Sequence, residues 1–254
     1  MFSSIERKLV LGALLVLVPT TLGLLIVTSS LISDEAKLGA DVNGYVEPKE
    51  LGGVIALTQD STVTVRCAEN SSSGFAVGLD DDDKENGFSL RKEKELGSQT
   101  LILTTLHSIE ACLAAGLVKI DISENRSFSA TILDFDNEND LAFLATKAKI
   151  EPLVLGYQIP FPGFWVMAIG SPHNFSGSIT FGNIINYDEL SVYSTASLSP
   201  GNSGGPLVDN VGLVVGINQG YKPIGQNFNI SISNNALCKY LIVCSTRLFI
   251  EEEQ

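Results

Sequence analysis

The chain has 254 residues, of which 44% are hydrophobic and 18% are charged, a composition typical of a folded globular protein and not of a disordered or collagenous one. Its formal net charge is −13, which argues against nucleic-acid binding through phosphate neutralisation, because that mechanism needs a basic face. Only 2 histidines occur, so a histidine-rich metal site is excluded and histidine-based catalysis has two candidates, His107 and His173.

The first predicted element is an uncharged run over residues 9–32, which is long enough for a membrane span of about 20 apolar residues. Basic residues precede the run and acidic residues follow it, so the positive-inside rule places residues 1–8 in the cytoplasm. The alternative is a cleaved signal peptide, whose apolar core usually has about 7–15 residues. We therefore expect residues 9–32 to be a transmembrane signal anchor that contacts the membrane. The rest of the chain is then extracytoplasmic, or secreted if residues 1–30 are cleaved.

Residues 33–50 are polar and include glycine and proline, which indicates a stalk between the membrane and a folded domain. That domain is expected over residues 51–245, and residues 246–254 are expected to form an acidic, solvated tail. Within the domain, residues 79–97 hold a run of charges that we interpret as a solvated hairpin tip. A calcium or partner loop is the alternative, although the spacing lacks the glycine and terminal glutamate of an EF-hand.

Inside the predicted domain, short β-type runs alternate with turn residues, a pattern typical of an all-β barrel or sandwich. Half of the runs lie on each side of residues 152–162, which predicts two similar barrels. Only two short helices are expected, one near residues 108–115 and a C-terminal one near residues 234–243. The expected strands are residues 62–66, 74–78, 100–105, 117–122, 128–133, 141–146, 164–169, 178–185, 192–195, 205–208, 213–217 and 226–230.

The 4 cysteines suit an oxidising compartment and allow three disulfide pairings. We favour Cys67–Cys112 and Cys238–Cys244, because the second pair is close in sequence and flanks one apolar segment. Buried free thiols are the alternative. The cysteine spacing matches no zinc template, so we expect no metal and no cofactor.

The motif with the clearest chemistry is Gly-Asn-Ser-Gly-Gly-Pro at residues 201–206. A serine nucleophile needs small neighbours that let a carbonyl substrate approach, and backbone N–H groups that point at the developing oxyanion. An ordinary glycine-rich turn is the alternative. The string also satisfies the nucleophile elbow of α/β-hydrolases, but that fold needs its histidine after the serine. Both histidines precede Ser203, which matches the chain order histidine, aspartate, serine.

The candidate base is His107, which stands where a β-type run ends and a polar turn begins, an edge position suited to a general base. His173 is the competitor and lies in a loop between predicted strands. Asp140 directly precedes an apolar run, so its carboxylate is placed to accept the histidine Nδ1–H and fix the tautomer. Asp134 and Asp136 are rivals for this role, but neither abuts the apolar run.

Three segments, residues 104–108, 139–144 and 201–206, resemble the chymotrypsin-fold serine proteases, and more narrowly their HtrA (DegP/DegS-like) branch. The resemblance extends over roughly residues 53–243, with further matches at residues 73–77, 168–172, 179–184 and 215–218. It implies two six-stranded antiparallel β-barrels with the active site in the cleft between them.

The resemblance also implies a role for each candidate residue. Ser203 would be the nucleophile, His107 the general base and then acid, and Asp140 the orienting acid. The backbone N–H groups of Gly201 and Ser203 would form the oxyanion hole. In this fold the residue six before the nucleophile lies at the base of the S1 pocket. That residue is the neutral Ser197, so we expect small to medium apolar P1 residues and not Arg or Lys.

Further substrate contacts are expected beside the pocket and along a strand that pairs with the bound peptide. The expected substrate-binding residues are Ser197, Leu198, Ser199, Ile217, Asn218 and Gln219. The PDZ domain common in this branch has no counterpart in the sequence after the last predicted helix, so PDZ regulation is not implied. The oligomeric state is left open.

The sequence thus predicts a membrane-anchored serine endopeptidase that acts on protein or peptide substrates in extracytoplasmic quality control or regulated proteolysis. The alternative is a catalytically silent protein that keeps the protease fold as a binding or scaffold module. All three residue types of the catalytic triad are present, which favours the enzyme.

Overall fold

The computed structural model describes residues 43–78, 88–90, 99–156, 161–172, 175–221 and 228–244. The predicted anchor over residues 9–32, the acidic tail over residues 246–254 and most of the charged run over residues 79–97 lie outside this set. Among the described residues, no helix is both long enough and apolar enough to cross a membrane. The compact unit that contains the described strands begins at Gly44.

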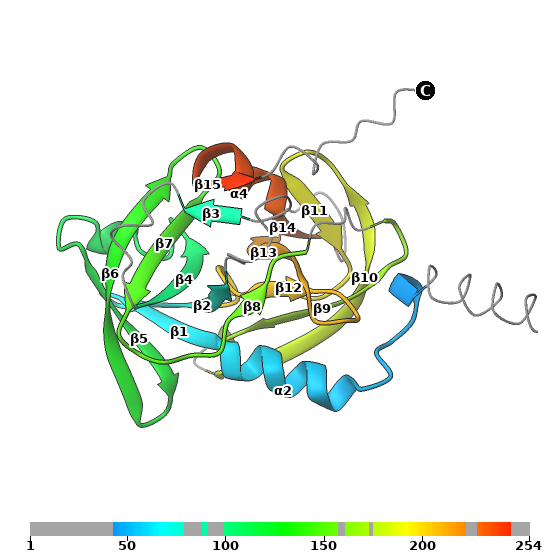
Figure 1. Ribbon diagram of the computed structural model, residues 1–254, viewed down its shortest axis with the longest axis horizontal. Coiled ribbons are helices and arrows are strands. Elements are labelled where there is room, and N and C mark those ends of the chain that lie inside the picture. The colour runs from blue at the N-terminus through cyan, green and yellow to red at the C-terminus, as the bar shows by residue number, and fades with distance from the viewer. Residues whose placement is uncertain are drawn as a thin grey trace, which may run out of the picture. The chain divides into compact units, whose positions relative to one another are not determined.

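The first barrel is drawn in cyan and green on the left of Figure 1. Its strands follow the order β1-β5-β6-β7-β4-β2, and the barrel closes because β1 also pairs with β2. Every neighbouring pair is antiparallel. The strands are β1 (Thr62–Cys67), β2 (Asn70–Gly78), β4 (Thr100–Thr105), β5 (Leu117–Ser123), β6 (Arg126–Asp136) and β7 (Leu141–Thr146).

The second barrel, in yellow and orange on the right of Figure 1, closes in the order β10-β11-β14-β13-β12-β9. Its strands are β9 (Trp165–Gly170), β10 (Ser178–Tyr187), β11 (Ser191–Ser194), β12 (Pro206–Val208), β13 (Val214–Tyr221) and β14 (Asn229–Ser233). The two six-stranded antiparallel barrels expected from the sequence are therefore confirmed. Three short strands are not among the predicted ones: β8 (Leu153–Val154) beside β2, and the pair β3 (Phe88–Leu90) and β15 (Ile242–Cys244).

A layer of apolar side chains lies between the two barrels. Strand β7 is buried at all six positions, because one face packs inside the first barrel and the other packs in the layer between the barrels. Ala142 and Leu144 pack inside the first barrel, whereas Leu141 and Phe143 belong to the layer between the barrels. Met167 from β9 of the second barrel joins the same layer. This double burial explains why the central strands are continuous apolar runs and not alternating ones.

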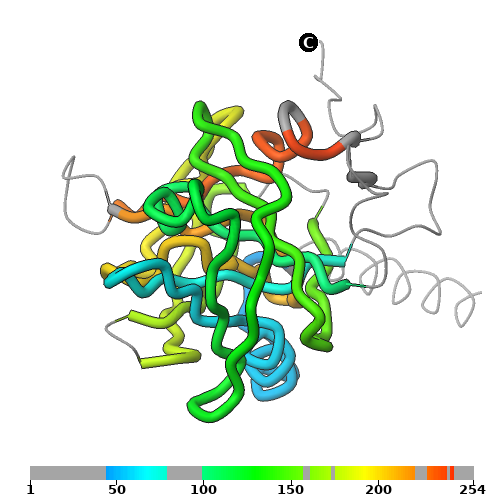
Figure 2. Tube along the Cα trace, turned by 90° about the vertical axis from the view of Figure 1, so that its left-hand side faces the viewer, coloured from blue at the N-terminus to red at the C-terminus, as the bar shows by residue number. Residues whose placement is uncertain are grey.

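Helix α2 (Leu51–Ser61) is missing from the sequence prediction, because its adjacent glycines and its serine and threonine are weak helix formers. Tertiary contacts hold it instead: Leu51, Val54 and Ile55 pack against the apolar layer between the barrels. The Thr58 hydroxyl donates to the Val54 carbonyl at 2.7 Å. The helix lies along the lower side of the barrels in Figure 1 and again in the turned view of Figure 2.

The helix expected near residues 108–115 is wrong, because the structure has only the three-residue 3-10 helix η2 (Glu110–Cys112) with turns on both sides. A disulfide from Cys112 to Cys67 on β1 and the complete burial of Ile109 hold this segment against the barrel as a turn.

The C-terminal helix is confirmed as α4 (Asn234–Tyr240), although it is shorter than predicted because β15 follows it. The Ser233 hydroxyl caps this helix by accepting the Asn235 N–H. A second, very short 3-10 helix, η1 (Asn43–Tyr45), precedes α2 and is not among the predicted elements.

The disulfide between Cys67 and Cys112 confirms the first predicted cysteine pairing, with Cα atoms 5.8 Å apart. Cys238 is disulfide-bonded as well. The side chain of Cys244 lies outside the described set, so the second predicted pairing stays a prediction.

Replacing both Cys67 and Cys112 by alanine should lower the free energy of unfolding by about 2–4 kcal/mol, because the bond restricts the unfolded chain over a sequence separation of 45 residues. Urea unfolding of the double variant and the wild type measures the difference. The exposed Ser123→Ala on β5 is the control and should change stability by less than about 0.5 kcal/mol. A double variant within that same range would contradict the prediction.

Candidate active site

The antiparallel pairing of β4 with β7 brings two of the predicted catalytic residues together. Thr105 at the end of β4 is the register partner of Leu141 at the start of β7. His107 lies just beyond the end of β4 and Asp140 directly precedes β7, so both emerge at the same end of the first barrel. The apolar runs that form the two strands therefore set the positions of both residues.

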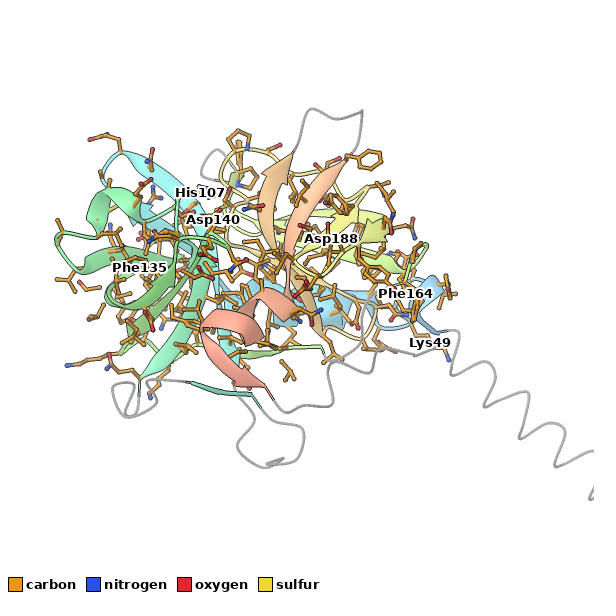
Figure 3. All side chains as sticks on the ribbon, turned by 90° about the horizontal axis from the view of Figure 1, so that it is seen from above. Lys49, His107, Phe135, Asp140, Phe164 and Asp188 are labelled. Atoms are coloured by element: carbon orange, nitrogen blue, oxygen red, sulfur yellow. A yellow bond between two sulfur atoms is a disulfide. The ribbon has the colours of Figure 1, made fainter. Side chains whose placement is uncertain are left out.

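Figure 3 shows His107 and Asp140 beside each other, and both carboxylate oxygens are engaged by the histidine. Asp140 Oδ2 lies 2.7 Å from His107 Nδ1, and Oδ1 accepts the backbone N–H of His107 at 2.8 Å. The Asp140 carbonyl also accepts the Leu106 N–H at 3.1 Å. These contacts hold the imidazole and the carboxylate in the orientation that directs Nε2 away from the aspartate for proton transfer.

The electrostatics of this pair favour an ionised carboxylate beside a basic imidazole. The hydrogen bond to Asp140 raises the pKa of His107 above its ordinary value, although partial burial opposes the shift. Attraction to the charges of Asp140 and Glu110 raises the pKa of His107 further. For Asp140, burial acts to raise the pKa. Hydrogen bonds from the side chain and backbone of His107, and one from Gln219, outweigh burial and hold the Asp140 pKa below its usual range.

The backbone of Asp140 is left-handed, with φ of 57°, which is uncommon for a residue other than glycine. Such a conformation costs about 1–3 kcal/mol and persists only where the surroundings enforce it. The preceding turn is braced by Asp136, which accepts the Glu138 N–H at 2.8 Å and the Asn139 side-chain amide at 2.5 Å. Asp136, a rival for the catalytic role in the sequence, thus bonds to the turn that carries Asp140.

Ser203 lies in the loop before β12, in the second barrel. Its hydroxyl donates to the Gln219 carbonyl at 3.0 Å. Across the described part of the chain, no hydrogen bond joins this hydroxyl to His107. Catalytic hydrogen bonds are often loose in the free state and tighten only when substrate binds.

Gln219 links the serine to the His107–Asp140 pair. It is the extra residue in a β-bulge of β13, where the register with β14 shifts between Asn218 and Gly220. The bulge lets its carbonyl meet Ser203, while its side-chain Nε2–H donates to Asp140 Oδ2 at 3.1 Å. The sequence predicts only a substrate-binding role for Gln219. The contact with Asp140 depends on a bulge that leaves no signal in the sequence.

The glycines of the 201–206 motif are required by close packing. A Cβ atom at Gly204 would lie 2.2 Å from the Ser73 carbonyl oxygen, and one at Gly205 would lie 2.1 Å from the Ile169 carbonyl oxygen. Within the described residues, the backbone N–H groups of Gly201 and Ser203 donate no hydrogen bond. These are the two N–H groups that the sequence predicts for the oxyanion hole.

The predicted substrate-binding residues fall into two groups by exposure. Ser197 and Ser199 are exposed and Leu198 is partly buried. Ile217 and Asn218 are fully buried, and β13 lies between β12 and β14 at Ile217.

The Asn218 backbone is bonded to the Gly204–Gly205 segment, and its side-chain amide donates to the Ile169 and Pro206 carbonyls. The edge of β13 that could receive a peptide therefore begins at Gln219. His173 lies outside the described residues. In the rest of the domain as described, no three side chains gather that could hold a metal ion.

Comparison with known proteins places this geometry in a family. The family model of the trypsin-like peptidase domain matches residues 85–217. A probable periplasmic serine endoprotease, DegP-like, from Marinomonas is 34% identical over 128 residues, which cover 46% of this chain and 26% of that protein. Human serine protease HTRA3 is 33% identical over 136 residues, which cover 46% of this chain and 30% of that protein. The chain thus spans about a third or less of the length of these relatives.

A solved serine endoprotease from Yersinia pestis shares the fold, with a TM-score of 0.60 at 22% sequence identity, over 76% of this chain and 66% of that one. The family match covers more than half of the chain and includes the segments of both His107 and Ser203. The chain therefore belongs to the trypsin-like peptidases, in their HtrA and DegP-like branch.

Proposed function

We propose that the chain is a serine endopeptidase that cleaves polypeptides through an acyl-enzyme formed on Ser203. The observation that carries this proposal is the double engagement of Asp140 by His107, with Ser203 joined to the same carboxylate through Gln219. In the part of the chain that the structure describes, the N–H of Ser203 itself and that of Gly201, two residues before it, donate no hydrogen bond. Membership of the peptidase family supports the same reaction.

In the first half of the reaction, the Ser203 hydroxyl rotates from the Gln219 carbonyl toward His107. His107 Nε2 takes the hydroxyl proton while Oγ attacks the scissile carbonyl carbon. The carbonyl oxygen becomes an oxyanion, which accepts hydrogen bonds from the N–H groups of Gly201 and Ser203. The imidazolium then gives its proton to the leaving amine, and the ester on Ser203 remains.

In the second half, a water molecule replaces the amine and gives its proton to His107 as it attacks the ester. The second tetrahedral intermediate collapses, the carboxylic acid product leaves, and Ser203 regains its proton. Asp140 stays ionised throughout and stabilises the imidazolium that forms in each half. The lowered pKa of Asp140 suits this role.

The proposal includes a substrate preference. Ser197 is neutral, which favours small to medium apolar P1 side chains over Arg or Lys. The peptide backbone would pair with β13 from Gln219 onward, because the preceding residues of this strand are already paired on both sides. Leu198 and Ser199 would line the approach to the P1 side chain.

The proposal also places the peptidase on a membrane, tethered by residues 9–32 with its barrels on the extracytoplasmic side. There it would serve protein quality control or regulated proteolysis. The uncharged run over residues 9–32 supports the anchor. The Cys67–Cys112 disulfide suits an oxidising compartment, and the Marinomonas relative carries the word periplasmic in its name.

Ser203→Ala should abolish labelling by a fluorophosphonate probe and lower the cleavage of unfolded casein by at least about 10³-fold, because the nucleophile is lost. The full-length protein is used, and the N-termini of the released peptides give the P1 preference. Ser129→Ala, an exposed serine on β6, is the control and should label normally. A wild type that neither labels nor cleaves would favour a silent scaffold and overturn the proposal.

The pH dependence follows from the raised pKa of His107. The base must be neutral, so kcat/KM should fall as the pH drops through the His107 pKa, which lies above the ordinary value of 6.5. Asp140→Asn removes the carboxylate whose hydrogen bond and charge raise this pKa, and should move the NMR titration of His107 to lower pH, with kcat lower by about 10⁴-fold. With 2 histidines in the chain, His173→Ala assigns the signals. An unmoved His107 titration in Asp140→Asn would contradict the assigned pair.

Ser197→Asp should redirect cleavage toward Lys or Arg at P1, because a carboxylate at the base of the pocket attracts a cation. Fluorogenic peptides that differ only at P1 measure this change. The ratio of kcat/KM for basic over apolar P1 should rise about 10-fold or more. Ser197→Ala is the matched control and should keep the apolar preference. An unchanged ranking in Ser197→Asp would place the P1 pocket elsewhere.

A further inference from the structure

Ser73, on β2 of the first barrel, is fully buried and uses every hydrogen-bonding group it has. Its N–H donates to the Ser203 carbonyl at 2.9 Å, and its own carbonyl accepts the Thr104 hydroxyl at 2.7 Å. Its hydroxyl donates to the Gly201 carbonyl at 2.7 Å and accepts the Ser171 N–H at 2.8 Å. One side chain of the first barrel thus joins two segments of the second barrel.

The bond to the Gly201 carbonyl fixes the peptide that joins Gly201 to Asn202. The N–H of the same peptide donates to the Ser199 carbonyl at 2.9 Å, so both of its polar groups are held. Gly201 has φ of 104°, a conformation that favours glycine. The Gly201 N–H belongs to the preceding peptide, which joins Pro200 to Gly201. With the Gly201–Asn202 peptide fixed and φ of Gly201 set, the direction of this N–H is set as well.

The bond from the Ser73 N–H fixes the other end of the same loop. The Ser203 carbonyl is held by Ser73, and the next N–H, that of Gly204, donates to the Asn218 carbonyl at 2.7 Å. Ser73 therefore contacts the backbone on both sides of the proposed nucleophile.

No other side chain of the described residues donates a hydrogen bond to the backbone of residues 201–205. The buried Oδ1 atom of Asn202, inside the loop itself, has no hydrogen-bond partner. The space around the Ser73 hydroxyl is also closed, because a Cβ atom at Gly170 would lie 2.9 Å from its Oγ. The Ser73 hydroxyl is thus the side-chain contact that holds this loop.

We infer that Ser73 is a positioning residue, which presets the Gly201–Ser203 backbone so that its N–H groups meet the oxyanion without rearrangement. It acts through the Gly201 and Ser203 carbonyls and does not touch the substrate. Donors that are aligned in advance stabilise a transition state without a cost of reorganisation during the reaction. The inference rests on the proposed peptidase activity and names a further residue for it.

Ser73→Ala should lower kcat by about 10–100-fold with KM within about twofold, because loss of a direct oxyanion donor costs about 10²–10³-fold and this loss is indirect. Ser72→Ala is the matched control. Ser72 is the neighbouring serine, is also buried, and its hydroxyl makes a single long contact of 3.5 Å to the Val65 carbonyl. Ser72→Ala should keep kcat within about twofold, because the Ser72 hydroxyl contacts Val65 and makes no hydrogen bond to residues 201–205.

Two readouts separate positioning from a loss of stability. The affinity for a peptide aldehyde, which forms a tetrahedral adduct on Ser203, should fall in Ser73→Ala by the same factor as kcat/KM. The NMR titration of His107 should stay as in the wild type, because the hydrogen bonds of Ser73 go to Ser203, Gly201, Thr104 and Ser171 and to neither His107 nor Asp140. An aldehyde affinity that stays at the wild-type value while kcat falls would overturn the inference.

The outcomes also separate this inference from the proposed function. An active wild type with equal kcat in Ser73→Ala and Ser72→Ala overturns the inference alone, whereas an inactive wild type overturns the peptidase proposal and the inference with it. If Ser73→Ala does not fold, Ser73→Cys replaces it, because the thiol is a weaker donor with a longer bond. Ser73→Cys should lose kcat and keep KM, and a wild-type kcat in that variant would also overturn the inference.

Discussion

The register between β4 and β7 is the constraint on which the site depends. A shift of one residue would move Phe143 and Leu144 to the wrong faces, because side chains alternate along a strand. Burial of each large apolar side chain contributes about 1.5–3 kcal/mol, whereas an exposed ion pair contributes about 0–1 kcal/mol. The His107 side chain is 47% exposed, so the pair with Asp140 does not hold itself in place. The core packing of β7 holds it.

The same apolar layer explains how two separately closed barrels form one site. His107 and Asp140 belong to the first barrel and Ser203 to the second, so their arrangement requires the barrels to keep a fixed relation. The layer between the barrels supplies it, because Phe143 and Met167 belong to one continuous cluster. The polar contacts across the boundary, such as that of Gln219 with Asp140, are then short because the barrels are already in place.

The sequence predicts the elements whose residue pattern itself specifies a strand or helix. It misses the elements that are stabilised by packing against other parts of the fold. The apolar runs of β4 and β7 have the same bounds in the prediction and in the structure. Helix α2 is missed because it is stabilised by packing and not by helix propensity, and β3, β8 and β15 are too short to show a pattern. The closeness of His107 and Asp140 is expected from the motifs. The partner of the Ser203 hydroxyl is not, because it depends on the bulge at Gln219.

The left-handed backbone of Asp140 limits which residues can occupy that position. Asparagine and aspartate tolerate this conformation better than other residues with a Cβ atom, because their short polar side chains bond locally. Glutamate carries the same charge, but its backbone would be strained in this conformation. Its longer side chain would also move the carboxylate away from His107. The fold therefore accepts asparagine, which is neutral but has the shape of aspartate, more readily than glutamate, which is charged but longer. At this position, a substitution can therefore remove the carboxylate and leave the fold intact.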